Sequence, residues 1–171
     1  PIYIFDQIIY FFLKKNFSNY LYDFLRQKYS TKKIENKSVV FFTPSKISQW
    51  RVDTIFEKEP ETIKFIENIK NGAVFFDIGA NVGIYSIFAA IKKKKIKVFS
   101  FEPSTSNLAL LSRNIYLNRL SNRVSIIQLP LGEKSLDLNS IREGFLEEGG
   151  SMNAFGVKYG FDGKKISAVN E

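Results

Sequence analysis

The chain has 171 residues, 44% of them hydrophobic, and carries 25 lysines and arginines against 17 aspartates and glutamates. This length and composition predict one globular domain with a sizeable core and exclude a disordered chain. The sequence contains no Cys and no His, which excludes disulfides, thiolate chemistry, histidine-based metal sites and histidine general bases. We therefore expect no metal, and any proton transfer has to use Asp, Glu, Lys, Tyr or water.

The net charge is +8, with lysine clusters at residues 14–15, 32–33, 92–95 and 164–165. Such a balance suits nucleic acid, anionic lipid or an acidic substrate, or it marks a solvated lysine-rich surface. No run of eighteen apolar residues occurs, so we expect no membrane-spanning helix. The chain begins at Pro1 without a signal-peptide pattern, and we expect an excerpt or a processed end. The absence of Cys fits a cytoplasmic location.

Residues 3 to about 28 have a helical period, and its change of phase near residue 16 predicts two short helices. We assign residues 1–36 to an N-terminal helical segment. Its aromatic and basic side chains suit either packing against the rest of the chain or docking to a membrane surface or a partner helix. Residues 37–52 are expected to form two short strands, a small β hairpin, around a turn at residues 43–45. A helix should follow at residues 59–70, with Pro60 in its first turn.

From residue 73 the pattern alternates between strands and helices. Strands are predicted at 73–78, 96–102 and 123–129, and helices at 82–92 and from an N-cap at Ser104. Near-continuous apolar strands in this order indicate a parallel sheet with right-handed crossovers, which is half of a doubly wound α/β fold. After residue 131 the signal weakens, and strands are only suggested at 135–141 and 164–170.

Two acids and two glycines mark the carboxyl ends of these strands. Asp77 ends the first strand and Glu102 ends the second, and parallel sheets bind ligands at that edge. Gly79 would let the backbone approach a ligand, and Gly83 would let the next helix start close by. A carboxylate in the place of Glu102 can accept hydrogen bonds from both hydroxyls of a ribose. These features predict a nucleoside cofactor site.

The glycine spacing narrows the choice of nucleoside. A dinucleotide site requires G-x-G-x-x-G, whereas this chain has D-x-G-x-x-x-G. Asn81 stands where the dinucleotide motif has its middle glycine. An acid beside the turn would repel a pyrophosphate, so a nicotinamide dehydrogenase is disfavoured. The same acid suits an ammonium group, such as that of S-adenosylmethionine. A tight strand-to-helix turn without any ligand is the structural alternative.

The segments "FFDIGANVGIYS", "VFSFEPSTSNLALLSRNIYLN" and "VSIIQLPLGEKS" resemble the FkbM-type methyltransferases, a class I S-adenosylmethionine-dependent family. The resemblance covers roughly residues 38–170. It implies that the first cofactor motif consists of Asp77, Gly79, Ala80, Asn81 and Gly83. It also implies that Glu102 holds the ribose, that Pro103 and Ser104 border the adenosine, and that residues 129–131 lie against the adenine.

The resemblance implies a Rossmann-like class I methyltransferase sheet within the α/β class, of which strand positions 3, 2 and 1 are present. In the family a fourth core strand follows, and the chain ends at Glu171 before any such motif. We therefore interpret residues 37–171 as the cofactor-binding part of a methyltransferase domain. The 171 residues alone are expected to be inactive.

The leading functional hypothesis is O-methylation of a hydroxyl on a sugar, lipid or secondary metabolite, with S-adenosylmethionine as cofactor. A base could be Glu59 or Glu61, although both could simply serve the start of a helix, and the catalytic residues stay unassigned. The loop at residues 149–153, around Ser151, could close over the site or be a plain turn. The alternatives are a nucleic-acid methyltransferase and a non-catalytic module that docks on a membrane or partner. The oligomeric state is left open.

Overall fold

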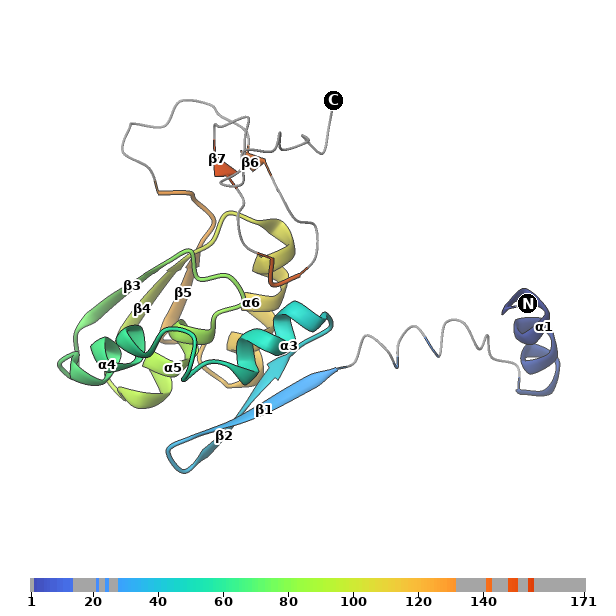
Figure 1. The fold of residues 1–171 in the computed structure, drawn as a ribbon, viewed down its shortest axis with the longest axis horizontal. Coiled ribbons are helices and arrows are strands. Elements are labelled where there is room, and N and C mark those ends of the chain that lie inside the picture. Colours follow the sequence, from blue (N-terminus) through green and yellow to red (C-terminus); the bar gives the residue numbers. More distant parts are fainter. Residues whose placement is uncertain are drawn as a thin grey trace.

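The computed structural model describes residues 2–13, 21, 24, 28–131, 141–142, 148–150 and 154–155 (Figure 1). The helices are α1 (Ile2–Leu13), α3 (Lys46–Asp53), α4 (Pro60–Asn68), α5 (Ile84–Lys92) and α6 (Thr105–Leu117). The strands are β1 (Tyr29–Ile34), β2 (Lys37–Phe42), β3 (Val74–Ile78), β4 (Lys97–Phe101), β5 (Val124–Ile127), β6 (Ile141–Arg142) and β7 (Ala154–Phe155).

The central sheet is parallel, with the strand order β3-β4-β5. Helices α5 and α6 form the two crossovers, so the predicted α/β, Rossmann-like arrangement is confirmed. Every strand and helix predicted between residues 73 and 129 is present, and no predicted end differs from the observed one by more than two residues. The reason is local: apolar strands alternate with amphipathic helices, and a turn residue separates each pair.

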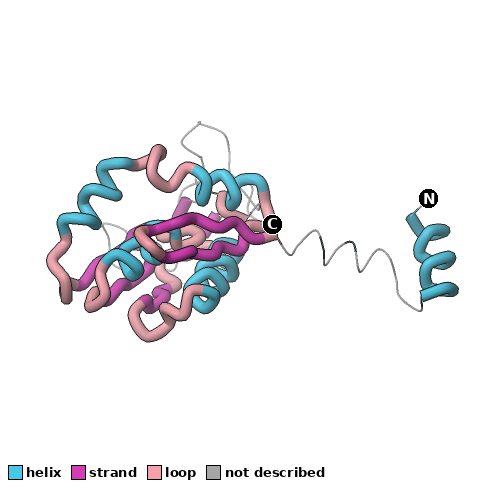
Figure 2. The backbone as a smooth tube through the Cα atoms, turned by 90° about the horizontal axis from the view of Figure 1, so that it is seen from below, coloured by secondary structure: helices cyan, strands magenta, loops and turns pink. Residues whose placement is uncertain are grey.

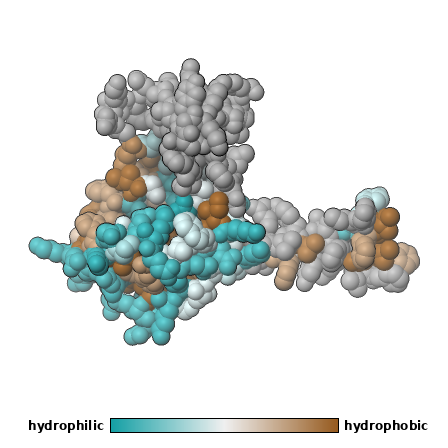
Figure 3. All heavy atoms as spheres, viewed as in Figure 1, coloured by the Kyte–Doolittle hydropathy of each residue, from teal (hydrophilic) through white to brown (hydrophobic). Residues whose placement is uncertain are grey.

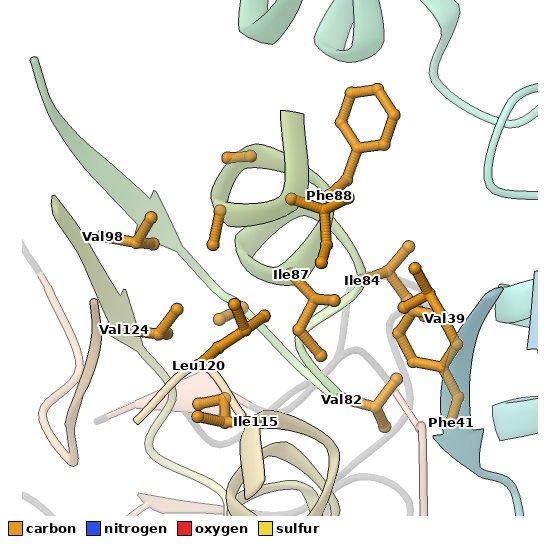
Figure 4. Close-up of a cluster of buried hydrophobic side chains, with 14 of the residues drawn as sticks. Val39, Phe41, Val82, Ile84, Ile87, Phe88, Val98, Ile115, Leu120 and Val124 are labelled. Carbon is orange, nitrogen blue, oxygen red and sulfur yellow. The ribbon is translucent and has the colours of Figure 1, made fainter. Parts of the chain in front are cut away.

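The hydrophobic core lies on the side of the sheet that α5 and α6 occupy. Figure 4 shows Ile87 and Phe88 of α5 together with Val98 and Val124 from the strands, and all four are buried. The strand β3 alternates, because Phe75 and Asp77 are buried whereas its other three residues are 50–66% exposed. Near-continuous apolar strands are typical of sheets that are covered on both faces, and the described residues cover only one face of this sheet.

The hairpin is formed by β1 and β2, which pair antiparallel around a turn at residues 35–36. The prediction of a second strand at residues 46–52 is wrong, since α3 lies there. Ser45 caps this helix in a capping box with Ser48, and that local pairing outweighs the strand pattern. Residues 29–34 were expected in the helical N-terminal segment and are a strand. A domain boundary at residues 36 and 37 would fall inside the hairpin turn.

Two asparagines of α6 attach the hairpin to the sheet domain. Asn114 accepts a hydrogen bond from the Phe42 backbone N–H at 2.7 Å and donates one to the Val82 carbonyl at 2.9 Å. Asn118 accepts from the Val40 N–H at 3.1 Å and donates to the Val40 carbonyl at 2.7 Å. The outer edge of β2 is therefore satisfied by side chains in place of another strand. Asn114 also joins this edge to the turn that follows β3.

Helix α1 confirms the first of the two predicted N-terminal helices, and the second lies largely outside the described residues. Both ribbon views place α1 apart from the sheet and the hairpin (Figures 1 and 2). Its apolar surface is exposed (Figure 3), with Tyr3 at 74% and Phe11 at 72%. Within the described part of the chain, no helix combines the length and the apolar composition needed to cross a bilayer.

Beyond residue 131 the structure describes three short stretches, residues 141–142, 148–150 and 154–155. Strands β6 and β7 pair antiparallel, and residues 148–150 lie against the sheet domain. The strand suggested at 135–141 falls outside the described residues except for Ile141, and the one suggested at 164–170 falls outside them entirely.

Candidate functional site

The turn after β3 is held against the end of β4. The backbone N–H groups of Gly79 and Ala80 both donate to the Phe101 carbonyl at 2.9 Å, and the Gly83 N–H donates to the Ala80 carbonyl at 2.8 Å. Gly79 has a φ of 76° and Asn81 a φ of 51°, so the turn passes through the left-handed region. A Cβ at Gly79 would have no atom within 4 Å, which leaves the backbone of the turn open to a ligand.

Gly83 is the N-cap of α5 and has a φ of 86°. A Cβ there would lie 2.5 Å from Leu111 Cδ1, a side-chain atom of α6. The close approach expected at Gly83 is therefore present, and its partner is α6 instead of the strand. Only a residue without a side chain brings α5, α6 and the turn this close together.

Glu102 lies directly after β4 with only 5% of its surface exposed. Its Oε2 accepts a hydrogen bond from the Asn81 backbone N–H at 2.7 Å, and its Oε1 accepts one from the Ser104 N–H at 2.9 Å. The structure thus joins the glycine turn, which the sequence predicts to be a cofactor motif, to the end of the second strand, as the parallel topology predicts. The side-chain nitrogen of Asn107 also donates to Oε1, at 3.5 Å. A carboxylate oxygen can accept two hydrogen bonds, so acceptor capacity for a ligand remains on Oε2. Pro103 is half-buried, and Ser104 is the buried N-cap of α6.

Asp77 is 8% exposed and faces the buried side of the sheet. The Ser86 hydroxyl of α5 donates to Asp77 Oδ2, and the Ser100 hydroxyl of β4 lies 2.6 Å from that of Ser86. Burial raises the pKa of Asp77, although its hydrogen bonds to Ser86 oppose the shift. A carboxylate that is costly to ionise in this place would be stabilised by a cationic ligand group.

A pocket of about 410 Å³ opens beside the turn. Its lining comes from the helices α3, α4 and α5, from β3 and from the turn, and includes Arg51, Glu59, Asp77, Gly79, Asn81 and Tyr85. The ionisable groups around it are two acids, one arginine, one lysine and one phenol, in line with a sequence that contains no His or Cys. Within the described part of the chain, no cluster of acidic residues could hold a metal ion.

The pocket separates the two candidate bases. Glu59 lines it, whereas Glu61 is exposed in the first turn of α4 and is not part of the lining. Burial opposes ionisation of Glu59, yet hydrogen bonds from Lys58, Thr62 and Tyr85 and the charge of Lys58 lower its pKa. Burial, with Glu59 next to it, raises the pKa of Tyr85 to about 12. Near neutral pH Glu59 is therefore the charged acceptor of the pair and Tyr85 the donor.

Residues 148–150, at the start of the loop that the sequence analysis named, form a strap against the sheet domain. The Asn107 side chain accepts from the Gly149 N–H and donates to the Gly150 carbonyl, and the Asn81 side chain also donates to Gly150. Gly149 has a φ of 86°, and a Cβ there would lie 2.9 Å from the Ser48 backbone nitrogen. The double glycine at 149–150 was the available signal. Ser151, in the loop that could close over the site or be a plain turn, falls outside the described residues.

The predicted adenine-facing segment begins just after β5. Leu129 is 46% exposed and Leu131 is 53% exposed, so both apolar side chains are accessible at the end of the sheet. A contact with adenine stays a prediction.

No protein-family model matches the chain. The chain is 36% identical over 56 residues to the 31-O-demethyl-FK506 methyltransferase FkbM of Streptomyces tacrolimicus, a match covering 33% of this chain and 22% of that protein. It is 31% identical over 70 residues to the methyltransferase sdnD of Sordaria araneosa, covering 41% of this chain and 27% of that protein.

The chain is FkbM-like in sequence. The predicted resemblance is thereby confirmed, and the match spans about a quarter of the length of each curated relative. Among solved structures, Trm5 of Methanocaldococcus jannaschii in complex with adenosine matches this FkbM-like chain with a TM-score of 0.38 and 19% identity, covering 59% of this chain and 29% of that one.

Proposed function

We propose that the protein is an S-adenosylmethionine-dependent methyltransferase. The observation that carries the proposal is Glu102, a buried carboxylate at the end of β4 that the Asn81 N–H ties to an open glycine turn. A ribose needs such an acceptor for its two hydroxyls, and the bare backbone at Gly79 leaves room for the ligand. The sequence match to two curated methyltransferases supports the reaction class.

The described residues fit this cofactor. Glu102 would hold the ribose, Gly79 and Asn81 would lie along the ligand, and Asp77 would face the ammonium group. When bound, S-adenosylmethionine supplies an electrophilic methyl group. The chain's own task is then to orient the acceptor in line with that group and to receive a proton. Glu59 is ionised and lines the pocket. We therefore assign to Glu59, and not to Glu61, the role of receiving the proton of the acceptor hydroxyl.

We further propose a hydroxyl acceptor on a sugar, lipid or secondary metabolite. The name of one relative refers to a 31-O-demethyl substrate, which makes an oxygen the methylated atom in that protein. The pocket supports the same chemistry here, because an ionised carboxylate can accept a hydrogen bond from a hydroxyl while the reaction proceeds.

Calorimetry with the full-length protein tests the cofactor assignment. S-adenosylmethionine and S-adenosylhomocysteine should both bind, whereas a nicotinamide dinucleotide should not, because the acid beside the turn repels a pyrophosphate. Binding of the dinucleotide without S-adenosylhomocysteine would refute the proposal. Transfer of a labelled methyl group to small hydroxylated acceptors then tests the reaction.

The pH dependence of binding should report on Asp77. Only the ionised carboxylate pairs with an ammonium group, and burial raises the pKa of Asp77. Affinity for S-adenosylhomocysteine should therefore fall as the pH is lowered through that raised pKa, by up to about tenfold per pH unit. Methylthioadenosine lacks the amino-acid end and should show a weaker dependence, which controls for other acids. An unchanged slope in Asp77→Asn would show that Asp77 does not hold the ammonium.

A further inference from the structure

Arg51 is the more buried of the two cationic side chains that line the pocket. It lies in the last turn of α3, is half-buried, and lines the pocket together with Asp77 and the glycine turn. Its Nε donates to the Gly149 carbonyl, so the strap takes one donor and fixes the direction of the guanidinium. An arginine has five N–H donors in a rigid fork, and the two terminal nitrogens carry the rest.

Among the residues that the structure describes, Arg51 forms no salt bridge. Within the described part of the chain, the salt bridges join Lys58 to Glu59 and Lys92 to Glu35 and Glu67. Burial lowers the pKa of Arg51, and the more distant charges of Glu59, Tyr85 and Glu102 oppose that shift. A partly desolvated guanidinium without a carboxylate partner is stabilised by an anionic ligand group, which it can bind through two parallel hydrogen bonds.

We propose that Arg51 binds the α-carboxylate at the amino-acid end of S-adenosylmethionine. This inference rests on the proposed function and deepens it. The amino-acid end carries one positive and one negative charge, and the pocket presents Asp77 for the first and Arg51 for the second. Lys58 also lines the pocket, but it is exposed and already paired with Glu59 at 2.9 Å. Arg51 is thus the cation with capacity for a ligand.

The strap explains how a residue of α3 is held in register with the turn after β3. Ser45, the N-cap of α3, donates to the Glu148 carbonyl, and Arg51 donates to the next carbonyl at Gly149. Asn81 of the turn donates to the carbonyl after that, at Gly150. Three successive carbonyls therefore tie the helix that carries Arg51 to the turn that approaches the cofactor, so the carboxylate subsite is formed before the ligand binds.

Two ligands that differ only in the carboxylate test the proposal. S-adenosylhomocysteine and its decarboxylated analogue are titrated calorimetrically into the full-length protein and its variants. Arg51→Gln should weaken S-adenosylhomocysteine by about 10- to 100-fold and change the affinity for the decarboxylated analogue by less than about threefold. Arg51→Lys should recover part of the loss, because it keeps the charge without the fork. Lys46→Gln removes a charge from the exposed side of the same helix and should leave both affinities unchanged.

The outcomes separate this inference from the proposed function. If the parent protein binds neither ligand, the cofactor assignment itself fails. If it binds both and Arg51→Gln weakens them equally, or weakens neither, the carboxylate assignment is overturned while the cofactor assignment stands. Thermal melts of each variant establish that it is folded. Should Arg51→Gln not fold, Arg51→Lys carries the test, since it must weaken S-adenosylhomocysteine more than the analogue.

Discussion

Replacing Glu102 with Ala is expected to weaken S-adenosylhomocysteine binding so far that calorimetry no longer detects it. The ribose would lose an ionised acceptor for two hydroxyls, and hydrogen bonds to charged groups contribute about 1.5–3 kcal/mol each. The loss corresponds to a Kd raised by at least about 100-fold. The substitution also leaves the N–H groups of Asn81 and Ser104 without their present acceptor, so the glycine turn is no longer tied to β4.

Two further variants separate these effects. Glu102→Gln keeps an oxygen that can accept one of the two backbone N–H groups and loses the charge, so its affinity should lie between those of the parent and Glu102→Ala. Gly79→Val leaves Glu102 intact and blocks the open space at the turn, and a β-branched residue at a φ of 76° is strained. Unchanged affinity in both Glu102→Ala and Gly79→Val would show that the cofactor does not bind at this turn.

The fold between residues 73 and 129 could be predicted because its signals are local. The apolar runs around Phe75 and Val98 define strands, and glycine or a capping serine marks where each helix begins. The pairing of Asp77 and Glu102 at one edge follows from the parallel topology alone. The same local reasoning failed at residues 46–52, where the apolar alternation is short and the capping pair of Ser45 and Ser48 determines the structure.

The open face of the sheet shows a second limit of local patterns. Val74, Phe76 and Ile78 are apolar, a composition that is typical of a strand buried on both sides, yet they are 50–66% exposed. In the structure Phe76 stacks on Phe99 with ring centroids 5.6 Å apart, and these rings lie on the side opposite α5. Apolar composition indicates that a face of a sheet can be buried, whereas the three-dimensional arrangement determines whether it is.

The residues that complete the site come from distant parts of the chain. Arg51 and Gly149 are 98 positions apart, and Asn107 and Gly149 are 42 apart. Neither pair belongs to a repeat or to a spacing that a helix or strand imposes, so the sequence offers no periodic signal for the contact. Sequence reasoning therefore placed Asp77 and Glu102 at one edge of the sheet and named residues 149–153 only as a loop, and it did not single out Arg51.

The contact between the hairpin and the sheet domain should have the largest effect on stability. Asn114 is fully buried, and Asn114→Ala would leave the Phe42 N–H and the Val82 carbonyl without partners. Each buried unsatisfied group costs about 1–3 kcal/mol, so the free energy of unfolding should fall by about 2–5 kcal/mol. Chemical denaturation of the purified variant measures this change.

Asn118→Ala is the matched control, because Asn118 holds the same strand through Val40 and is only half-buried. Water can replace its side chain at the edge of β2, so its loss should cost about 1 kcal/mol or less. Since Asn114 also bonds the carbonyl of Val82, next to Asn81, its removal should weaken S-adenosylhomocysteine binding as well, whereas Asn118→Ala should not. Equal destabilisation by the two variants would mean that apolar contacts hold the hairpin, with Phe41 buried in the core. The hydrogen bonds of Asn114 to the hairpin and the glycine turn would then contribute no more to stability than those of Asn118.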